Sequence, residues 1–233
     1  MELDEMAKCL KDSLDLEFNP VGIVLFRREE DIPGDVEEVE EPYRHCQMVL
    51  GASRDGKTYF ARKETHSCKG GATGLGLIDW PPNISSGNLY RSKLNKNITQ
   101  GVARRVVAKM PCPAPGSTVA TLIGPLKDLK ITPDVIIFIG TPFQARRISQ
   151  AVVYKQGGRL SFNSAGIQSF CVDATAVPYL TGNINISMGC DGAAKNAGLK
   201  DDEVVVGIPF ELLEDICTVF NERHEGWDTW MRS

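Results

Sequence analysis

The sequence lacks the features that identify several large classes of protein. No two of its seven cysteines are three positions apart, so it has no C-x-x-C pair of the kind found in zinc ribbons, ferredoxins and thioredoxins. No run of 18 apolar residues is present, and we therefore expect no transmembrane helix and no membrane partner. Lysine and arginine number 26 against 30 aspartates and glutamates, a balance without the basic excess of a general nucleic-acid binder.

The common motifs of catalysis and phosphate binding are missing as well. The glycine-rich segment 70–76 matches neither the P-loop nor the dinucleotide-binding fingerprint, and the chain has no serine nucleophile elbow and no H-E-x-x-H. Whether the protein is an enzyme is therefore left open. Its first residues lack the basic start and apolar stretch of a secretory signal, so we expect a cytoplasmic protein. In that compartment cysteines are reduced thiols or metal ligands rather than disulfides.

Apolar segments bounded by turn residues alternate with amphipathic segments along the 233 residues. Strands are expected at 19–26, 58–62, 117–124, 133–140, 160–164 and 202–210. Helices are expected at 3–16, 43–52, 89–109, 142–154 and 210–220, and the acidic stretch 29–41 is expected to be a solvated loop. This pattern predicts one domain over residues 1–233, of the α/β or α+β class, with a mixed sheet and flanking helices.

Two parts of the chain, 17–130 and 131–220, show their expected elements in the same order. In each, an apolar strand near a proline is followed by a helix, a glycine turn, a second strand and a cysteine, which is Cys68 in the first part and Cys171 in the second. The order indicates an internal duplication that gives two pseudo-symmetric halves, although chance similarity of two βα units would give the same order. A duplication would bring Cys68 and Cys171 toward the interface of the halves, where ligand sites are common.

Local context divides the seven cysteines into two groups. Cys9 and Cys217 lie on apolar helix faces and Cys112 lies between two prolines, where a thiol packs as a small hydrophobic group. The others lie in polar segments or segments of small residues, and they are Cys46, Cys68, Cys171 and Cys190. Four thiolates are the usual ligands of a cubane iron–sulfur cluster or a structural zinc ion, so these four are the candidate metal ligands. Four unrelated loop thiols would produce the same pattern.

Two alternatives to an iron–sulfur cluster stay open. His66 and Cys68 would share one metal ion on an extended loop, which favours a zinc-stabilised scaffold, whereas His45 and Cys46 point in different directions on a helix. The other alternative is a binding module for a small anionic metabolite with purely structural cysteines. The metabolite would be bound by the glycine segment 70–76 and by five arginines: Arg44, Arg104, Arg105, Arg146 and Arg147. His224, near the chain end, is expected to be exposed.

A set of short segments resembles one protein family. The segments are P-V-G-I-V-L-F (20–26), R-H-C-Q (44–47), T-H-S-C (65–68), G-P-L-K-D (124–128), P-D-V-I-I-F-I-G (133–140), S-F-C-V-D (169–173), S-M-G-C-D-G (187–192) and V-G-I-P-F-E (206–211). Together they are similar to the domain of unknown function 169 family of archaea and anaerobic bacteria, over about residues 14–213. That family has no established activity to carry over.

The family motifs include cysteines that match Cys46, Cys68, Cys171 and Cys190, and they leave out Cys9, Cys112 and Cys217. An anaerobic setting, which the resemblance implies, suits an oxygen-sensitive cluster. Our leading hypothesis is a cytoplasmic protein that holds a [4Fe–4S] cluster through these four cysteines. Its role would be electron transfer with a redox partner protein, redox sensing or metallocofactor chemistry.

Overall fold

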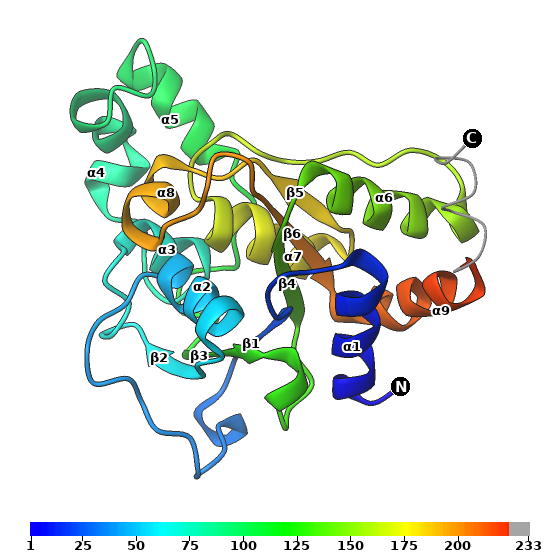
Figure 1. Ribbon diagram of the computed structural model, residues 1–233. Coiled ribbons are helices and arrows are strands. Elements are labelled where there is room, and N and C mark those ends of the chain that lie inside the picture. The colour runs from blue at the N-terminus through cyan, green and yellow to red at the C-terminus, as the bar shows by residue number, and fades with distance from the viewer. Residues whose placement is uncertain (224–233) are drawn as a thin grey trace.

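The computed structural model describes residues 1–223, and in this part the chain forms one six-stranded sheet with helices on both faces (Figure 1). The strands are β1 (Val21–Phe26), β2 (Tyr59–Arg62), β3 (Ala120–Pro125), β4 (Val135–Gly140), β5 (Asn185–Ser187) and β6 (Val204–Pro209). Their order is β2-β3-β1-β4-β6-β5. The expected α/β class with flanking helices is confirmed, but all these strand pairs are antiparallel rather than mixed.

Nine α-helices and five shorter helical segments are present in the described part of the chain. The α-helices are α1 (Leu3–Leu14), α2 (His45–Asp55), α3 (Lys69–Gly74), α4 (Pro82–Ser85), α5 (Gln100–Ala108), α6 (Pro142–Gln156), α7 (Val177–Thr181), α8 (Asp191–Ala197) and α9 (Leu213–Arg223). Short 3₁₀ turns are η1 (Glu29–Asp31), η3 (Leu126–Asp128) and η5 (Phe210–Leu212), and two π-helical segments are η2 (Leu89–Lys93) and η4 (Ser169–Ala176). None of the described helices is long and apolar enough to cross a membrane.

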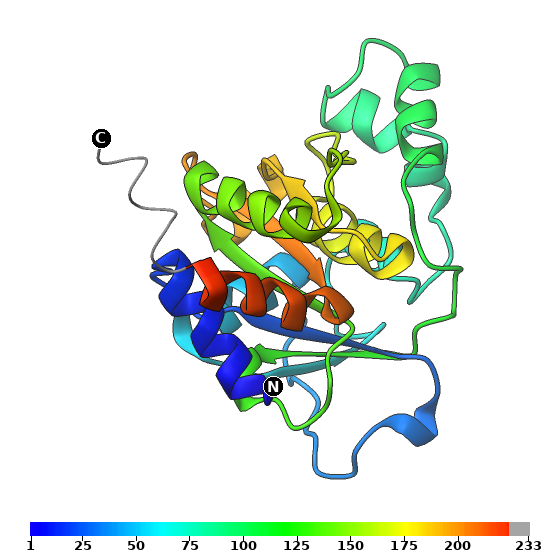
Figure 2. The same cartoon turned by 90° about the vertical axis from the view of Figure 1, so that its right-hand side faces the viewer.

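Alternation of side chains along the central strands produces two cores. On β4, Val135 and Ile137 face a core shared with α2, α3 and η4, whereas Ile136 and Phe138 face a core shared with α1, α6 and α9. Figure 2 shows α1, α6 and α9 on the face of the sheet toward the viewer. Because both faces are covered, the central strands are apolar at nearly every position. Such unbroken apolar segments predict buried strands from the sequence.

The order of the strands is symmetric about the centre of the sheet. β1 and β4 pair at its centre, β3 and β6 lie outside them, and β2 and β5 form the edges. A proline ends both β3 and β6, at Pro125 and Pro209, and each is followed by a 3₁₀ turn. Before each edge strand a helix ends at a glycine with positive φ, Gly56 at 68° and Gly182 at 65°. The strand topology of residues 17–130 thus corresponds to that of residues 131–220.

This correspondence pairs the cysteines differently from the sequence-based expectation. Cys68 and Cys190 each precede the helix that follows an edge strand, α3 and α8. Cys46 and Cys171 each lie in the first turn of the helical segment before an edge strand. Cys46 lies ten residues before Gly56, and Cys171 lies eleven residues before Gly182. The additional residue in the second half falls in a segment that includes the π-helical η4. The counterpart of Cys68 is therefore Cys190, not Cys171.

Two expected elements differ in the structure. Residues 160–164 form no strand. The backbone of Asn163 bonds to the side chain of Asn185 in β5 instead of to the backbone of a neighbouring strand. The Asn185 side chain accepts from the Asn163 N–H at 2.7 Å and donates to the Asn163 carbonyl at 2.8 Å. The single helix expected at 89–109 is divided into η2 and α5, since Thr99 caps α5 by accepting a hydrogen bond from the Val102 N–H. His224 lies outside the described residues.

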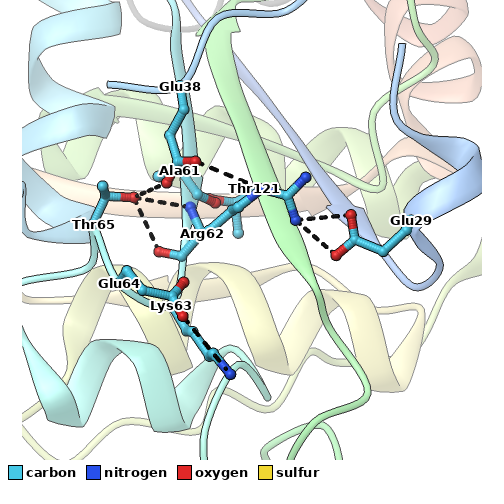
Figure 3. Close-up of polar contacts among 8 residues, drawn as sticks. All are labelled: Glu29, Glu38, Ala61, Arg62, Lys63, Glu64, Thr65 and Thr121. Carbon is cyan, nitrogen blue, oxygen red and sulfur yellow. Dashed lines mark hydrogen bonds and ion pairs between the residues drawn. The ribbon is translucent and has the colours of Figure 1, made fainter. Parts of the chain in front are cut away.

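The acidic segment 29–41 is tied to edge strand β2 rather than free in solvent. Arg62 donates to both carboxylate oxygens of Glu29, at 2.7 and 2.8 Å, and lies 3.6 Å from Glu38 (Figure 3). The Val39 N–H also bonds to the Phe60 carbonyl at 2.9 Å. The segment therefore covers part of an edge strand that would otherwise present unpaired backbone groups.

Replacement of Arg62 by alanine is expected to loosen this segment without unfolding the domain. The change removes the ion pairs to Glu29 and Glu38, whereas the backbone bond at Val39 remains. Cleavage between residues 29 and 41 by a glutamate-specific protease should therefore become faster, while the unfolding midpoint changes little. The exposed neighbour Lys63, changed to alanine, is the control, and equal cleavage rates in the two variants would contradict the assignment.

Candidate functional site

A cavity of about 470 Å³ opens on the face of the sheet that α2, α3, η4 and α8 cover. All four cysteines singled out in the sequence line it: Cys46 from α2, Cys68 at the start of α3, Cys171 from η4 and Cys190 at the start of α8. The remaining cysteines do not line this cavity. Cys112 packs beside the core, and Cys9 and Cys217 form a hydrogen-bonded pair between α1 and α9. All seven are free thiols.

Each cavity cysteine is positioned by the beginning of a helical segment. Cys68 is the N-cap residue of α3, and its sulfur accepts a hydrogen bond from the Gly71 N–H at 3.4 Å. The Cys190 sulfur accepts one from the Ser169 hydroxyl at 3.2 Å. Because the first backbone N–H groups of a helix have no partner within it, helix starts are favourable surroundings for a negatively charged sulfur.

In the absence of a positive charge the thiols of Cys46 and Cys171 stay protonated. Burial raises the pKa of Cys46 to about 12, and the neighbouring Cys190 and Cys68 sulfurs add to the rise. Burial likewise raises the pKa of Cys171 well above its ordinary value, again with a contribution from the other cavity cysteines. Cys46 and Cys171 therefore do not ionise near neutral pH unless a cation compensates them. The raised pKa values of Cys46 and Cys171 do not suit a reactive thiolate, which requires a lowered pKa.

Among the described residues, no group of three or more histidine, cysteine, aspartate or glutamate side chains is close enough to hold a metal ion. His45 and His66 are buried and stacked, with ring centroids 6.4 Å apart. Their Nε2 atoms bond to Thr175 and Thr121. Burial lowers the pKa of His45 to about 3 and that of His66 to about 4, so both rings are neutral. His45 lines the cavity.

Two cavity residues were not found by the sequence analysis. Tyr90, on η2, is buried, and its hydroxyl accepts a hydrogen bond from Gln168 Nε2 at 2.7 Å. Burial raises the pKa of Tyr90, so it remains a protonated hydroxyl. Gln168 adopts the left-handed conformation with φ of 55°, unusual for a residue with a side chain, immediately before η4. No sequence motif marks either residue, since their pairing joins segments 78 positions apart.

The glycines of segment 70–76 allow close packing of α3 against η4. A Cβ at Gly70 would lie 2.9 Å from Gln168 Nε2, and one at Gly74 would lie 2.7 Å from Val172 Cγ2. The space beside these glycines is filled by side chains of the protein itself. Their role in helix packing is thus explained without a phosphate ligand.

Of the five arginines weighed as anion ligands, Arg44 alone lines this cavity. Arg104 lies in a separate surface depression with Pro82 and Gln100, and the Arg146 and Arg147 guanidinium groups lie over the Phe143 ring. Two lysines also line the cavity. Lys96 forms an ion pair with Asp191, whereas no ion pair to a described residue involves Lys195.

The chain was compared with protein-family models, curated proteins and solved structures. The model of the domain of unknown function 169 family, described as an uncharacterised ArCR family, matches residues 9–219. The "Uncharacterized protein MJ0308" of Methanocaldococcus jannaschii is 37% identical over 227 residues, which cover 97% of each chain. No solved structure matches. Both the family match and this relative agree with the resemblance seen in the motifs, and the chain belongs to the domain of unknown function 169 family.

Proposed function

We propose that this protein holds a [4Fe–4S] cluster in the cavity through Cys46, Cys68, Cys171 and Cys190. The observation that carries the proposal is that four cysteines from four separate segments line one cavity, while the remaining three lie elsewhere. Thiolates are the usual ligands of such clusters. When bound, the cluster would supply one-electron chemistry, and the roles that follow are electron transfer, redox sensing or support of a metallocofactor.

The matched positions of the cysteines in the two halves support this proposal. We infer that an internal duplication produced the halves, with one ligand pair in each: Cys46 and Cys68 in the first, Cys171 and Cys190 in the second. Cys9, Cys112 and Cys217 have no such counterparts among the cysteines. A site placed between related halves is a common arrangement for ligand binding.

The donor chemistry favours a cluster over a single zinc ion. One tetrahedral ion requires all four sulfurs within about 2.3 Å of a single centre. In the part of the chain that the structure describes, no group of three or more histidine, cysteine, aspartate or glutamate side chains could hold a metal ion. In a cubane cluster each thiolate binds a different iron, so the sulfurs stand apart across the inorganic core. The hydrogen bonds to the sulfurs of Cys68 and Cys190 are of the kind that adjusts the reduction potential of a cluster.

The charges around the cavity also suit a cluster with thiolate ligands. The Arg44 guanidinium on its wall, whose positive charge acts on the Cys46 thiol, would offset part of the negative charge of the ligated core. Cluster binding would in turn release the protons that burial holds on Cys46 and Cys171. Such thiols require a reducing compartment, so we place the protein in the cytoplasm with a redox protein as its electron partner.

Anaerobic preparation of the full chain tests the proposal. We expect a brown protein with a broad absorption band near ~400 nm and about four irons and four sulfides per chain, either as isolated or after incubation with ferrous iron and sulfide. Reduction with dithionite should bleach the band. A colourless protein that takes up one zinc ion per chain would instead establish the scaffold, and one that takes up neither metal would leave the cysteines structural.

A further inference from the structure

We propose that the part of the cavity not taken up by the cysteines binds a small organic carboxylate with an apolar body. This inference rests on the proposed function, because it places the cluster at the cysteine end of the cavity and the organic molecule beside it. The site is assigned to Arg44 and Lys195 for the acid group, and to Leu89, Leu94 and Ile167 for the apolar body.

The cavity has room for more than an inorganic core. Its volume of about 470 Å³ lies within the range of pockets for small organic ligands, roughly 300 to 1,000 Å³. A core of eight atoms, each given about 30 Å³ as for a water molecule, would fill about half of it. The cysteines lie at the starts of α2, α3, η4 and α8. The remaining lining includes residues of η2 and, in the last turn of α8, Lys195 and Asn196.

The apolar wall is supplied mainly by a helical lobe, residues 82–108, that only one half of the fold has. In the first half this lobe lies between α3 and β3, whereas in the second half residues 198–203 suffice to join α8 to β6. Figure 1 shows α4 and α5 of the lobe projecting beyond the end of the sheet. Leu89, Tyr90 and Leu94 of the lobe line the cavity, and Leu94 remains 49% exposed there. An apolar surface placed at a cavity in this way suits the body of a ligand.

The charged groups of the wall select for an anion. Lys96 is neutralised by Asp191, but no ion pair to a described residue involves Arg44 or Lys195. A guanidinium or an ammonium without a carboxylate partner is suited to a carboxylate of a ligand. A phosphate site would normally add a cradle of backbone N–H groups at a glycine loop. Here Gln168 and Val172 fill the space beside Gly70 and Gly74, so we assign the carboxylate.

Calorimetric titration of the anaerobic, iron-loaded protein tests the inference. Hexanoate and phenylacetate are the probes, hexanamide and phenylacetamide their neutral counterparts, and inorganic phosphate the competing anion. We expect saturable binding of a carboxylate at one site and binding of its amide weaker by about tenfold or more, because the amide lacks the charge. Lys195→Gln should weaken carboxylate binding by a similar factor. The exposed Lys200, changed to glutamine, is the matched control and should leave it unchanged.

The outcomes separate this inference from the proposed function. Iron and sulfide content are measured on the same samples, and Lys195→Gln should leave both unchanged because it removes no cluster ligand. Iron-loaded protein that binds acid and amide equally, prefers phosphate, or binds neither carboxylate would overturn the carboxylate site and leave the cluster intact. Protein that takes up no iron and sulfide under the loading conditions, yet binds a carboxylate through Lys195, would overturn the cluster and retain the site.

Discussion

Serine in place of any one of Cys46, Cys68, Cys171 or Cys190 is expected to cut the iron and sulfide content of the anaerobically prepared protein to a small fraction of the wild-type value. A hydroxyl at the same position is a far poorer ligand for iron than a thiolate, and the cavity offers no other cysteine to replace it. Because cluster binding stabilises the folded state by mass action, the thermal unfolding midpoint should fall as well. Iron analysis, the absorption band and thermal unfolding are the measurements.

The three cysteines outside the cavity are the controls for this experiment. Cys9→Ser, Cys112→Ser and Cys217→Ser should retain the wild-type iron content, since none of these thiols lines the cavity. Cys217→Ser places a hydroxyl in a fully buried position and should lower stability without loss of iron per folded chain. Circular dichroism of the metal-free variants separates failure to fold from failure to bind. Full iron content in a folded single variant of the cavity group would remove that cysteine from the ligand set.

Replacement of Gly207 by alanine should strongly destabilise the protein. Gly207 lies in β6 directly against η4, which carries Cys171. A Cβ at Gly207 would lie within 2.7 Å of the Ala174 carbonyl carbon and closer still to its oxygen, and 2.8 Å from Pro178 Cγ. Backbone cannot rotate away as a side chain can, so η4 would have to move off the sheet. We expect a loss of at least about 3 kcal/mol in the free energy of unfolding, at the upper end of overpacking effects.

Gly34→Ala is the matched control for this substitution. Gly34 has no heavy atom within 4 Å of an added Cβ and does not have a positive φ. Its stability in urea should therefore stay within about 0.5 kcal/mol of the wild type, as for an exposed site. If Gly207→Ala unfolded at the same urea concentration as Gly34→Ala, the close contact between β6 and η4 would not hold η4 in place.

Apolar strands and the grouping of cysteines were accessible from the sequence because both depend on immediate neighbours. Residues 21–26 and 135–140 are apolar throughout, since helices cover both faces of the sheet at these strands. Local surroundings set Cys46, Cys68, Cys171 and Cys190 apart from Cys9, Cys112 and Cys217, and the first four are the cysteines that line the cavity. The family resemblance depended on the same short segments.

The tertiary structure alone decided which segments meet. Strand β5, Asn185–Ser187, is too short to show an alternating pattern, and its backbone is fixed by pairing with β6. Residues 160–164 have the alternation of a strand, yet the Asn185 side chain of β5 bonds to both the N–H and the carbonyl of Asn163. Tyr90 and Gln168 meet across the cavity only because the inserted lobe folds back over η4.

The pairing of the halves shows the same division. Sequence order suggested Cys68 and Cys171 as counterparts, because a glycine turn and a short apolar segment precede both. Strand pairing instead matches Cys68 with Cys190 and Cys46 with Cys171. Local propensity cannot reveal this, because strand neighbours are chosen by which apolar faces they bury together and by hydrogen bonds between distant segments. The local sequence thus determined which cysteines lie in polar segments or segments of small residues. Only the packing of the sheet and helices determined that these cysteines share one cavity.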